Sequence, residues 1–353
     1  MLFSSKSNGF FVEQNDHAVL LARTSAASAP LTVEEVAECS REDEAAVAET
    51  IRRVQPTKAP SGYLHAICGV YPPHRLVRRA TLDLKKVKEP AYFTEVLSTQ
   101  FRVEAEKYTV FVMNAPDGTD FDVAKAAQKE AIFCGMQTEE IGIVQDELLA
   151  KGIFPERLEL GSVAGLGAMV DYLAFRKSKT PTLVLEIGAD STHSFIVSGS
   201  GVEASRPIPQ GLESMVPVVQ TELKLKDAES ARKLFFSNAF DFTGMGPMLV
   251  KKLLKELQSS IGFYEVQTGQ SVGQLLCTSL SPKLGWLEGA ISNALGISVL
   301  KLELAPWLQS RQIALAESLP VASLDARWLG LFGLMTYYTN PSPPDAAVPE
   351  KKG

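Results

Sequence analysis

The chain has 353 residues, of which 45% are hydrophobic and 22% charged, and its formal net charge is −6. This length predicts two or three domains or subdomains, and the composition is that of a globular protein rather than a disordered one. The negative charge argues against a general nucleic-acid-binding protein, which would carry a basic face. We interpret the one short basic run, His74 to Arg79, as a strand with solvated arginine side chains.

The sequence contains no pattern of a signal peptide, a membrane span or a metal centre. No window reaches about 18 consecutive apolar residues, the length that a membrane-spanning helix requires. The four histidines are scattered, and the four cysteines form no C-x-x-C pair, so we expect buried free thiols rather than disulfides or zinc ligands. These features predict a cytoplasmic protein without direct membrane insertion.

The N-terminal part is predicted to alternate strands with one helix. "GFFVEQ" and "HAVLLARTS" are predicted strands, joined by the turn pair Asn15-Asp16. We expect helical structure after residue 31, because Thr32 and Glu35 form a capping box. A helix is then expected to open near Ser40 and to end before Pro56. "SGYLHAICGVYPP" and "HRLVRRATLDL" are predicted as two further strands.

The middle of the chain is more polar and is predicted to be mixed α/β. The pattern predicts a helix over 91–101, a strand over 107–116, a second helix over 122–136 and a short strand over 140–147. A helix of small residues follows over 161–177. Its Gly pair is interpreted as a packing feature, because the third glycine of a dinucleotide motif is missing.

The second half opens with "LVLEIGADSTHSFIVSGSGVEASRPIPQG", Leu183 to Gly211, which predicts three strands. A polar helical block, a long helix, a strand, a helix ended by Gly296, a strand and a final helix are expected after it. The tail at 341–353 is Pro-rich and is predicted to be disordered. The segments "FFVEQNDHAVLLART" and "LVLEIGADSTHSFIV" repeat one pattern of strand, acid, turn and strand, which indicates two related α/β lobes.

With this repeat, with "IPQG" after the second hairpin and with the helix "LQSSIGFYEVQTG", the chain resembles the PilM family of actin-like type IV pilus assembly proteins. More distantly it is similar to FtsA and to the cytoplasmic domain of GspL. The resemblance spans about residues 8–340 and implies an actin-like (ribonuclease H-like), two-lobed α/β fold. It divides the chain into lobe 1 (subdomain 1A) at 1–80, 149–178 and 315–340, inserted subdomain 1C at 81–148, lobe 2 (subdomain 2A) at 179–212 and 262–314, and subdomain 2B at 213–261.

In related proteins that hydrolyse ATP, each lobe carries an Asp-x-Gly hairpin. The glycine lets backbone N–H groups approach the phosphates, and the aspartate holds Mg²⁺ through water. The resemblance matches these hairpins to two groups of altered residues here: Glu13, Asn15 and Asp16 in the first, and Glu186, Gly188, Asp190, Ser191 and Thr192 in the second. The two glycines that contact adenosine in the family are matched by Thr278 and Ser279.

These altered motifs predict that the chain binds no nucleotide cofactor and is not an enzyme, because extra carboxylates repel phosphates and side chains fill the backbone surface. An alternative is a working ATPase or kinase that binds ATP with Mg²⁺, in which Glu13 and Glu186 serve Mg²⁺ and Asp190 is the base. A second alternative is that both glutamates are ordinary strand-end acids. A cell-division role like that of FtsA requires a C-terminal amphipathic helix, which the Pro-rich tail does not provide.

The resemblance implies a scaffold of a type IV pilus or type II secretion assembly platform at the bacterial inner membrane. Such a protein binds the short cytoplasmic N-terminal segment of a PilN-like single-span membrane protein in a groove between subdomains 1A and 1C. An extended segment would dock by sheet-edge hydrogen bonds and side-chain pockets. We assign this groove to Arg78, Val110, Val112 and Asn114. Self-association is left open, and no nucleic-acid partner is expected.

Overall fold

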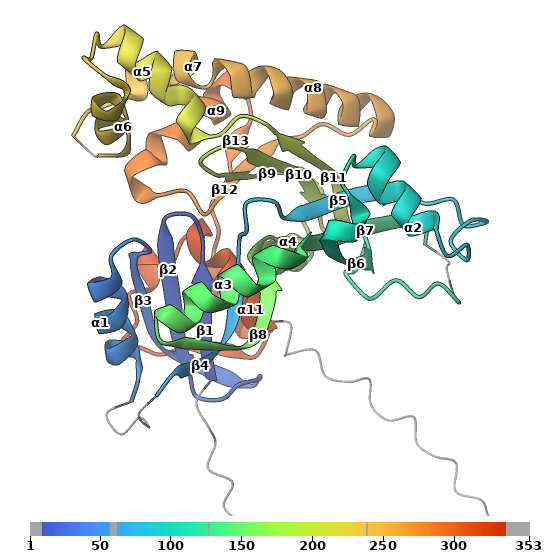
Figure 1. The fold of residues 1–353 in the computed structure, drawn as a ribbon, viewed down its shortest axis with the longest axis horizontal. Coiled ribbons are helices and arrows are strands. Elements are labelled where there is room, and N and C mark those ends of the chain that lie inside the picture. The colour runs from blue at the N-terminus through green and yellow to red at the C-terminus, as the bar shows by residue number, and fades with distance from the viewer. Residues whose placement is uncertain (1–8, 57–61, 126–127, 238, 337–353) are drawn as a thin grey trace, which may run out of the picture.

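The computed structural model describes residues 9–56, 62–125, 128–237 and 239–336, and every structural statement below concerns these residues. They form a lower and an upper α/β lobe, with a smaller three-stranded part beside them (Figure 1). The predicted disordered tail at 341–353 lies outside the described residues.

Lobe 1 is built on a six-stranded sheet with the order β14-β3-β2-β1-β4-β8. Its first three strands are antiparallel neighbours, and β4 and β8 continue the sheet parallel to β1. The elements of this lobe are β1 (Gly9–Gln14), β2 (Ala18–Thr24), β3 (Leu31–Ser40), α1 (Glu44–Val54), β4 (Leu64–Val70), α3 (Thr138–Ala150), β8 (Ile153–Leu160), α4 (Gly161–Phe175), α10 (Leu304–Ser310), β14 (Ile313–Leu315) and α11 (Leu329–Thr336).

Lobe 2 repeats this arrangement with the order β11-β10-β9-β12-β13. Again three antiparallel strands are followed by two that run parallel to the first. Its elements are β9 (Thr182–Ile187), β10 (Thr192–Ser198), β11 (Gly201–Ile208), α5 (Val216–Glu222), α6 (Ala228–Phe236), α7 (Gly246–Leu249), α8 (Lys251–Thr268), β12 (Gln274–Thr278), α9 (Gly285–Leu295) and β13 (Ser298–Val299). The duplicated order confirms the predicted two-lobed actin-like fold.

The third sheet, β5-β7-β6, belongs to the inserted part. It contains β5 (Leu76–Thr81), β6 (Tyr108–Asn114) and β7 (Glu130–Gln137), and its helical cover is α2 (Tyr92–Glu95), which continues as a π-helix over Val96–Gln100. β5 also contacts β11 of lobe 2, and the Arg79 N–H donates to Ser205 Oγ over 2.6 Å. Since α3 of lobe 1 contacts β7, the inserted part touches both lobes.

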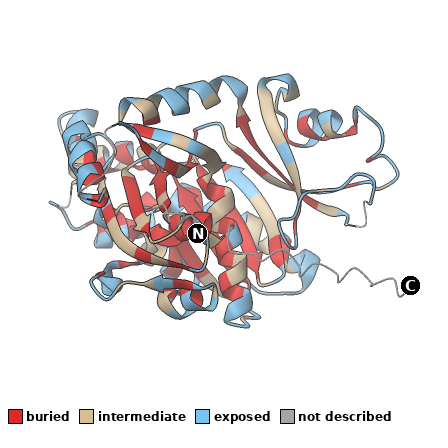
Figure 2. Cartoon of the chain, turned by 90° about the horizontal axis from the view of Figure 1, so that it is seen from below, coloured by how far each residue is buried: buried red, intermediate tan, exposed pale blue. Residues whose placement is uncertain are grey.

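A single apolar core joins the two lobes. Helices α4 and α11 lie between the two large sheets, where Phe11 of β1, Leu166 of α4, Phe195 of β10 and Phe332 of α11 pack together. Figure 2 shows the buried residues gathered in the sheets and in the helices between them, with exposed residues on the outer helices. None of the described helices is both long and apolar enough to cross a bilayer.

Three sequence-based assignments of secondary structure are wrong. Leu31–Ser40 forms β3 rather than helical structure, and the helix begins only after Asp43, whose side chain accepts from the Ala46 N–H. Glu130–Gln137 forms the central strand β7 where a helix was predicted, and Thr138–Ala150 forms helix α3 where a short strand was predicted. β7 is buried on both faces between β5 and β6, so its apolar run has no periodicity that separates a strand from a helix.

Three of the four cysteines match the expectation of buried free thiols: Cys68, Cys134 and Cys277. Cys39 is a free thiol that is only half-buried. Burial raises the pKa of Cys68 and of Cys134 to about 12, so both remain protonated. No group of three or more metal-ligating side chains occurs within the described residues.

Candidate functional site

The candidate site lies where the first hairpins of the two lobes face each other. Glu13 is the last residue but one of β1, and Glu186 has the same place in β9. The turns that follow approach closely, because a Cβ atom on Gly188 would lie only 2.9 Å from Asp16 Oδ2. The two acids and the turns that the sequence singles out are therefore brought together in one cleft.

Glu13 is fully buried and makes one hydrogen bond. Its Oε1 accepts from the Tyr71 hydroxyl over 3.0 Å, whereas its buried Oε2 has no hydrogen-bond partner among the described residues. Burial raises the pKa of Glu13 to about 8, the Tyr71 hydrogen bond opposes this rise, and the charge of Glu186 adds to it. Glu13 is therefore mostly a neutral carboxylic acid at pH 7.

Tyr71 fills the space between the lobes, and two glycines make room for it. A Cβ atom on Gly161 would lie 2.2 Å from Tyr71 Cε2, and a Cβ atom on Gly330 would lie 2.3 Å from Glu13 Oε2 and 2.9 Å from the Tyr71 hydroxyl. Real Cβ atoms cannot approach so closely, so both positions require glycine as long as the Tyr71 ring stays where it is.

Glu186 lies in a different environment, although its place in the fold is the same. Its Oε2 accepts from Arg75 Nη2 over 2.9 Å and from the Ser162 hydroxyl over 2.6 Å. Arg75 Nε also donates to Ser162 Oγ over 2.8 Å, which closes a triangle of hydrogen bonds. The side chains of Arg75 and Glu186 are only 8% and 6% exposed, so this ion pair is buried inside the cleft.

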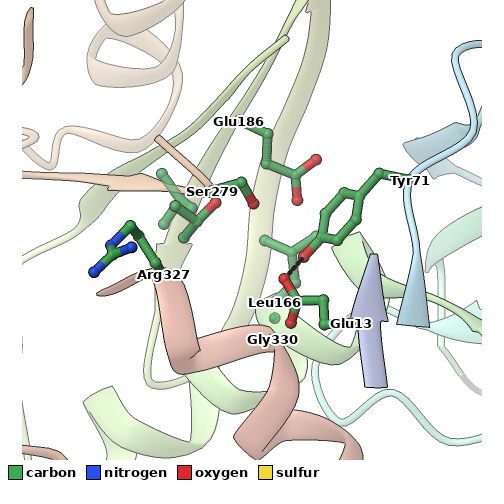
Figure 3. Close-up of a pocket in the computed structure, with 10 residues that line it drawn as sticks. Glu13, Tyr71, Leu166, Glu186, Ser279, Arg327 and Gly330 are labelled. Carbon is green, nitrogen blue, oxygen red and sulfur yellow. Dashed lines mark hydrogen bonds between the residues drawn. The ribbon is translucent and has the colours of Figure 1, made fainter. Parts of the chain in front are cut away.

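Little space remains between these groups. Figure 3 shows Tyr71 reaching across to Glu13, with Glu186 and Ser279 on the other side and Arg327 at the margin. The cavity that these residues enclose has a volume of about 10 Å³. That volume holds about one water molecule. A cavity of this size is too small for a nucleoside triphosphate, and Tyr71 and Arg75 would have to move before one could enter between Glu13 and Glu186.

The remaining residues of the hairpins mostly stabilise their own turns. Asn15 is buried, and its Oδ1 accepts from the N–H groups of His17 and Ala18. Thr192 is buried, and its hydroxyl donates to the carbonyl oxygen of Gln210. The Gly188 N–H, which would have to face a phosphate, already donates to the Ser191 carbonyl oxygen over 2.9 Å.

The positions matched to the adenosine motif also lie at the cleft. Thr278 and Ser279 line the small cavity at the end of β12, whereas the side chains of Asp16 and Asp190 are exposed. Ser279 has a φ of 56°, a left-handed conformation that glycine adopts more readily than serine.

Sequence reasoning missed the residues that fill the cleft. Tyr71, Arg75, Ser162 and Gly330 come from three segments that are far apart in the sequence. The only local signal is "YPPHR", in which two prolines follow the end of β4, so that Tyr71 and Arg75 lie outside the strand. Nothing in that pattern indicates that these two side chains point toward Glu13 and Glu186.

The residues assigned to the partner groove share one face of the inserted sheet. Arg78 and Val112 are both opposite Phe133 in the register, and Val110 and Val112 are half-buried against the core beneath α2. Asn114 Nδ2 donates to Thr119 Oγ1 over 2.9 Å at the end of β6. Three of these side chains therefore already pack or bond within the inserted part.

Comparisons with known proteins agree with the fold. No family model and no curated protein matches the chain. Among solved structures, a chain of a PilM-PilN type IV pilus biogenesis complex is 18% identical with a TM-score of 0.65, over 95% of this chain and 100% of that one. The predicted similarity to PilM-like proteins is confirmed at the level of the fold.

Two weaker matches are an actin-like ATPase-fold protein of unknown function from Bacteroides thetaiotaomicron and the cytoplasmic domain of EpsL, an inner-membrane component of the type II secretion system of Vibrio cholerae. The first is 8% identical with a TM-score of 0.44, over 95% of this chain and 98% of that one. The second is 11% identical with a TM-score of 0.39, over 96% of each chain.

Proposed function

We propose that this chain is a non-catalytic, actin-like scaffold of a type IV pilus or type II secretion assembly platform. In this proposal it binds the short cytoplasmic N-terminal segment of a PilN-like single-span membrane protein, and through that partner it stays at the cytoplasmic face of the inner membrane. The observation that carries the non-catalytic part is the filled cleft. Tyr71 and Arg75 occupy the space between the lobes, and the cavity that remains has a volume of about 10 Å³.

Electrostatics supports the same proposal. ATP brings several negative charges, whereas Arg75, the cation that bonds inside this cleft, is already paired with Glu186. Asp16 and Asp190 add two carboxylates at the turns where a phosphate would have to lie. Repulsion between like charges at close range costs about 1 kcal/mol in water and several times that where the charges are partly desolvated.

The partner segment is proposed to dock at β6, the edge strand of the inserted sheet. One end of its outer edge is already covered by residues 119–121: the Val112 carbonyl oxygen accepts from the Phe121 N–H, and the Asn114 N–H donates to the Thr119 carbonyl oxygen. Alternate residues of a strand present their backbone groups to the same edge, so the N–H and C=O of Val110 also face this outer edge. No described residue is shown to bond to them there. Next to it, the Phe111 side chain is 69% exposed. A partner strand would pair with Val110 and cover Phe111.

Two measurements test this proposal. In thermal unfolding, a ligand at one hundred times its Kd adds about 2.7 kcal/mol to the free energy of unfolding. We expect no shift in Tm with millimolar Mg-ATP, and a clear shift would refute the non-catalytic proposal.

In affinity capture from inner-membrane extract followed by mass spectrometry, we expect a single-span protein with a short cytoplasmic head.

A matched pair of variants locates the docking site. Phe111→Ser is expected to weaken capture of that protein, because it removes the apolar side chain beside the open edge. Phe263→Ser is the control, since Phe263 of α8 is similarly exposed, at 66%, but lies on lobe 2. Equal capture by both variants and the unchanged protein would refute docking at β6.

A further inference from the structure

Arg78 of β5 carries a positive charge that no carboxylate of the described residues balances. It makes no ion pair with any described residue, and its Nε is buried without a hydrogen-bond partner in the described part of the chain. Its guanidinium lies 4.9 Å from the centre of the Phe101 ring, which holds the group in place by a cation–π contact. The Nε of the neighbouring Arg79 also lacks a hydrogen-bond partner among the described residues, but its Nη2 pairs with Glu130 Oε2 over 2.9 Å.

The strand that lies against β5 carries a second arginine. The bond from the Arg79 N–H to Ser205 fixes β5 against β11, and Arg206 follows Ser205 in β11. Burial lowers the pKa of Arg78, and the charge of Arg206 lowers it further. His193 contributes no charge, because burial, with the charges of Arg75 and Arg78, lowers its pKa to about 3.

Arg206 is itself held in position from the other side. Its Nη1 donates to Ser260 over 3.1 Å and its Nη2 to Glu256 over 2.6 Å, both on α8. Glu256 therefore balances Arg206, and the Arg78 guanidinium remains uncompensated by the described residues at the seam between the inserted sheet and lobe 2. A half-buried charge of this kind is costly unless a group of opposite charge joins it.

We propose that Arg78 forms a binding site for an oxyanion, either a carboxylate or a phosphate group. Two oxygens of such a group can accept from the planar guanidinium in parallel, which is the strongest form of this contact. Arg78 was assigned to the partner groove from the sequence, but the site goes beyond the proposed function, because it takes an anion at β5, whereas the proposed partner segment pairs with β6, at the opposite edge of the same sheet.

The test measures Tm of the full chain against citrate and against inorganic phosphate, with sodium chloride at the same ionic strength as the reference. Either anion is expected to raise Tm, and the concentration dependence gives an apparent Kd. Hydrogen bonds to a charged group are strong enough that Arg78→Gln should weaken this Kd by about tenfold. Arg79→Gln, the matched control, should leave it unchanged.

The two anions distinguish the chemistry, since a response to citrate alone assigns a carboxylate and a response to phosphate alone assigns a phosphate group. Equal responses of the unchanged protein, Arg78→Gln and Arg79→Gln, or no response to either anion, would overturn the proposal. If Arg78→Gln does not fold, Arg78→Lys replaces it, because lysine keeps the charge but loses the planar fork and should also weaken binding.

Discussion

Glu13 and Glu186 occupy equivalent places in the two lobes, and yet their carboxyl groups bond to different partners. Each is the last residue but one of the first strand of its lobe, and each points into the cleft. Glu13 meets a tyrosine hydroxyl and an apolar wall, and its pKa rises to about 8. Glu186 accepts from a guanidinium and a serine hydroxyl in a buried ion pair.

The comparison teaches that a duplicated fold repeats positions but not environments. Both differences come from one segment, residues 71–75, which enters the cleft from lobe 1 between β4 and β5. Tyr71 turns toward Glu13 and Arg75 toward Glu186, so the segment lies between the two lobes and bonds to both. The chain thereby fills the space between the two lobes with its own side chains.

The largest effect on stability is expected when the ion pair between Arg75 and Glu186 is broken. Arg75→Met should lower the free energy of unfolding by about 3–5 kcal/mol, because it leaves Glu186 buried and charged without a partner. The double variant Arg75→Met/Glu186→Leu should recover most of that loss, since no unpaired charge remains. Urea unfolding measures both. A loss below about 1 kcal/mol in the single variant would contradict the buried pair.

The second effect concerns the pH dependence of stability, to which the titration of Glu13 should contribute. Its pKa is about 8 in the folded state, against an ordinary value of 4.5 for a glutamate side chain in water, so the folded state binds the proton more tightly. Its stabilising contribution is complete below about pH 4.5 and is lost as the pH rises through 8. The slope is at most about 1.4 kcal/mol per pH unit.

Glu13→Gln should remove this slope, because the amide resembles the protonated acid and does not titrate. The free energy of unfolding of both proteins, measured by urea at intervals from about pH 5 to 8, gives the difference. Parallel curves for the two proteins would show that Glu13 does not titrate with the shifted pKa.

A smaller effect is expected at the glycine that makes room for Tyr71. Gly161→Ala should cost about 1–3 kcal/mol, because its Cβ forces the Tyr71 ring to move. Gly167→Ala is the matched control on the same helix, where no atom lies within 4 Å of the added Cβ. There the better helix propensity of alanine should stabilise the protein by up to about 1 kcal/mol. If both variants lose stability equally, the Tyr71 ring does not pack on Gly161.

The smallest effect on stability is expected when the hydroxyl of Tyr71 is removed. Tyr71→Phe removes one hydrogen bond, which is worth about 1 kcal/mol, and should raise the pKa of Glu13 further because that bond opposes the rise. Tyr63→Phe, at a side chain that is 52% exposed, should change neither quantity. Urea unfolding at several pH values measures both changes, and a Tyr71→Phe protein with an unaltered pH profile would contradict the hydrogen bond.

The strands that were predicted wrongly, β3 and β7, are both paired along both of their edges. β3 carries a Thr-x-x-Glu pattern that is typical of a helix start, but the sheet overrides it, because β2 and the distant β14 pair with its two edges. β7 was predicted as part of a helix over 122–136, because apolar residues of that segment recur near one helical face. In both cases the deciding partner lies elsewhere in the chain.

The sequence by itself determined the repeated strand–acid–turn–strand pattern, the two lobes that follow from it, and the positions of Glu13 and Glu186 at the cleft. Those features depend on residues close together in the chain, where periodicity and turn chemistry act. Only the tertiary structure decided that Tyr71, Arg75 and Ser162 fill the cleft beside Gly330, and that Glu13 bonds to a tyrosine hydroxyl while Glu186 bonds to a guanidinium. Burial and charge pairing depend on residues that the fold brings together from distant segments, and no local pattern records them.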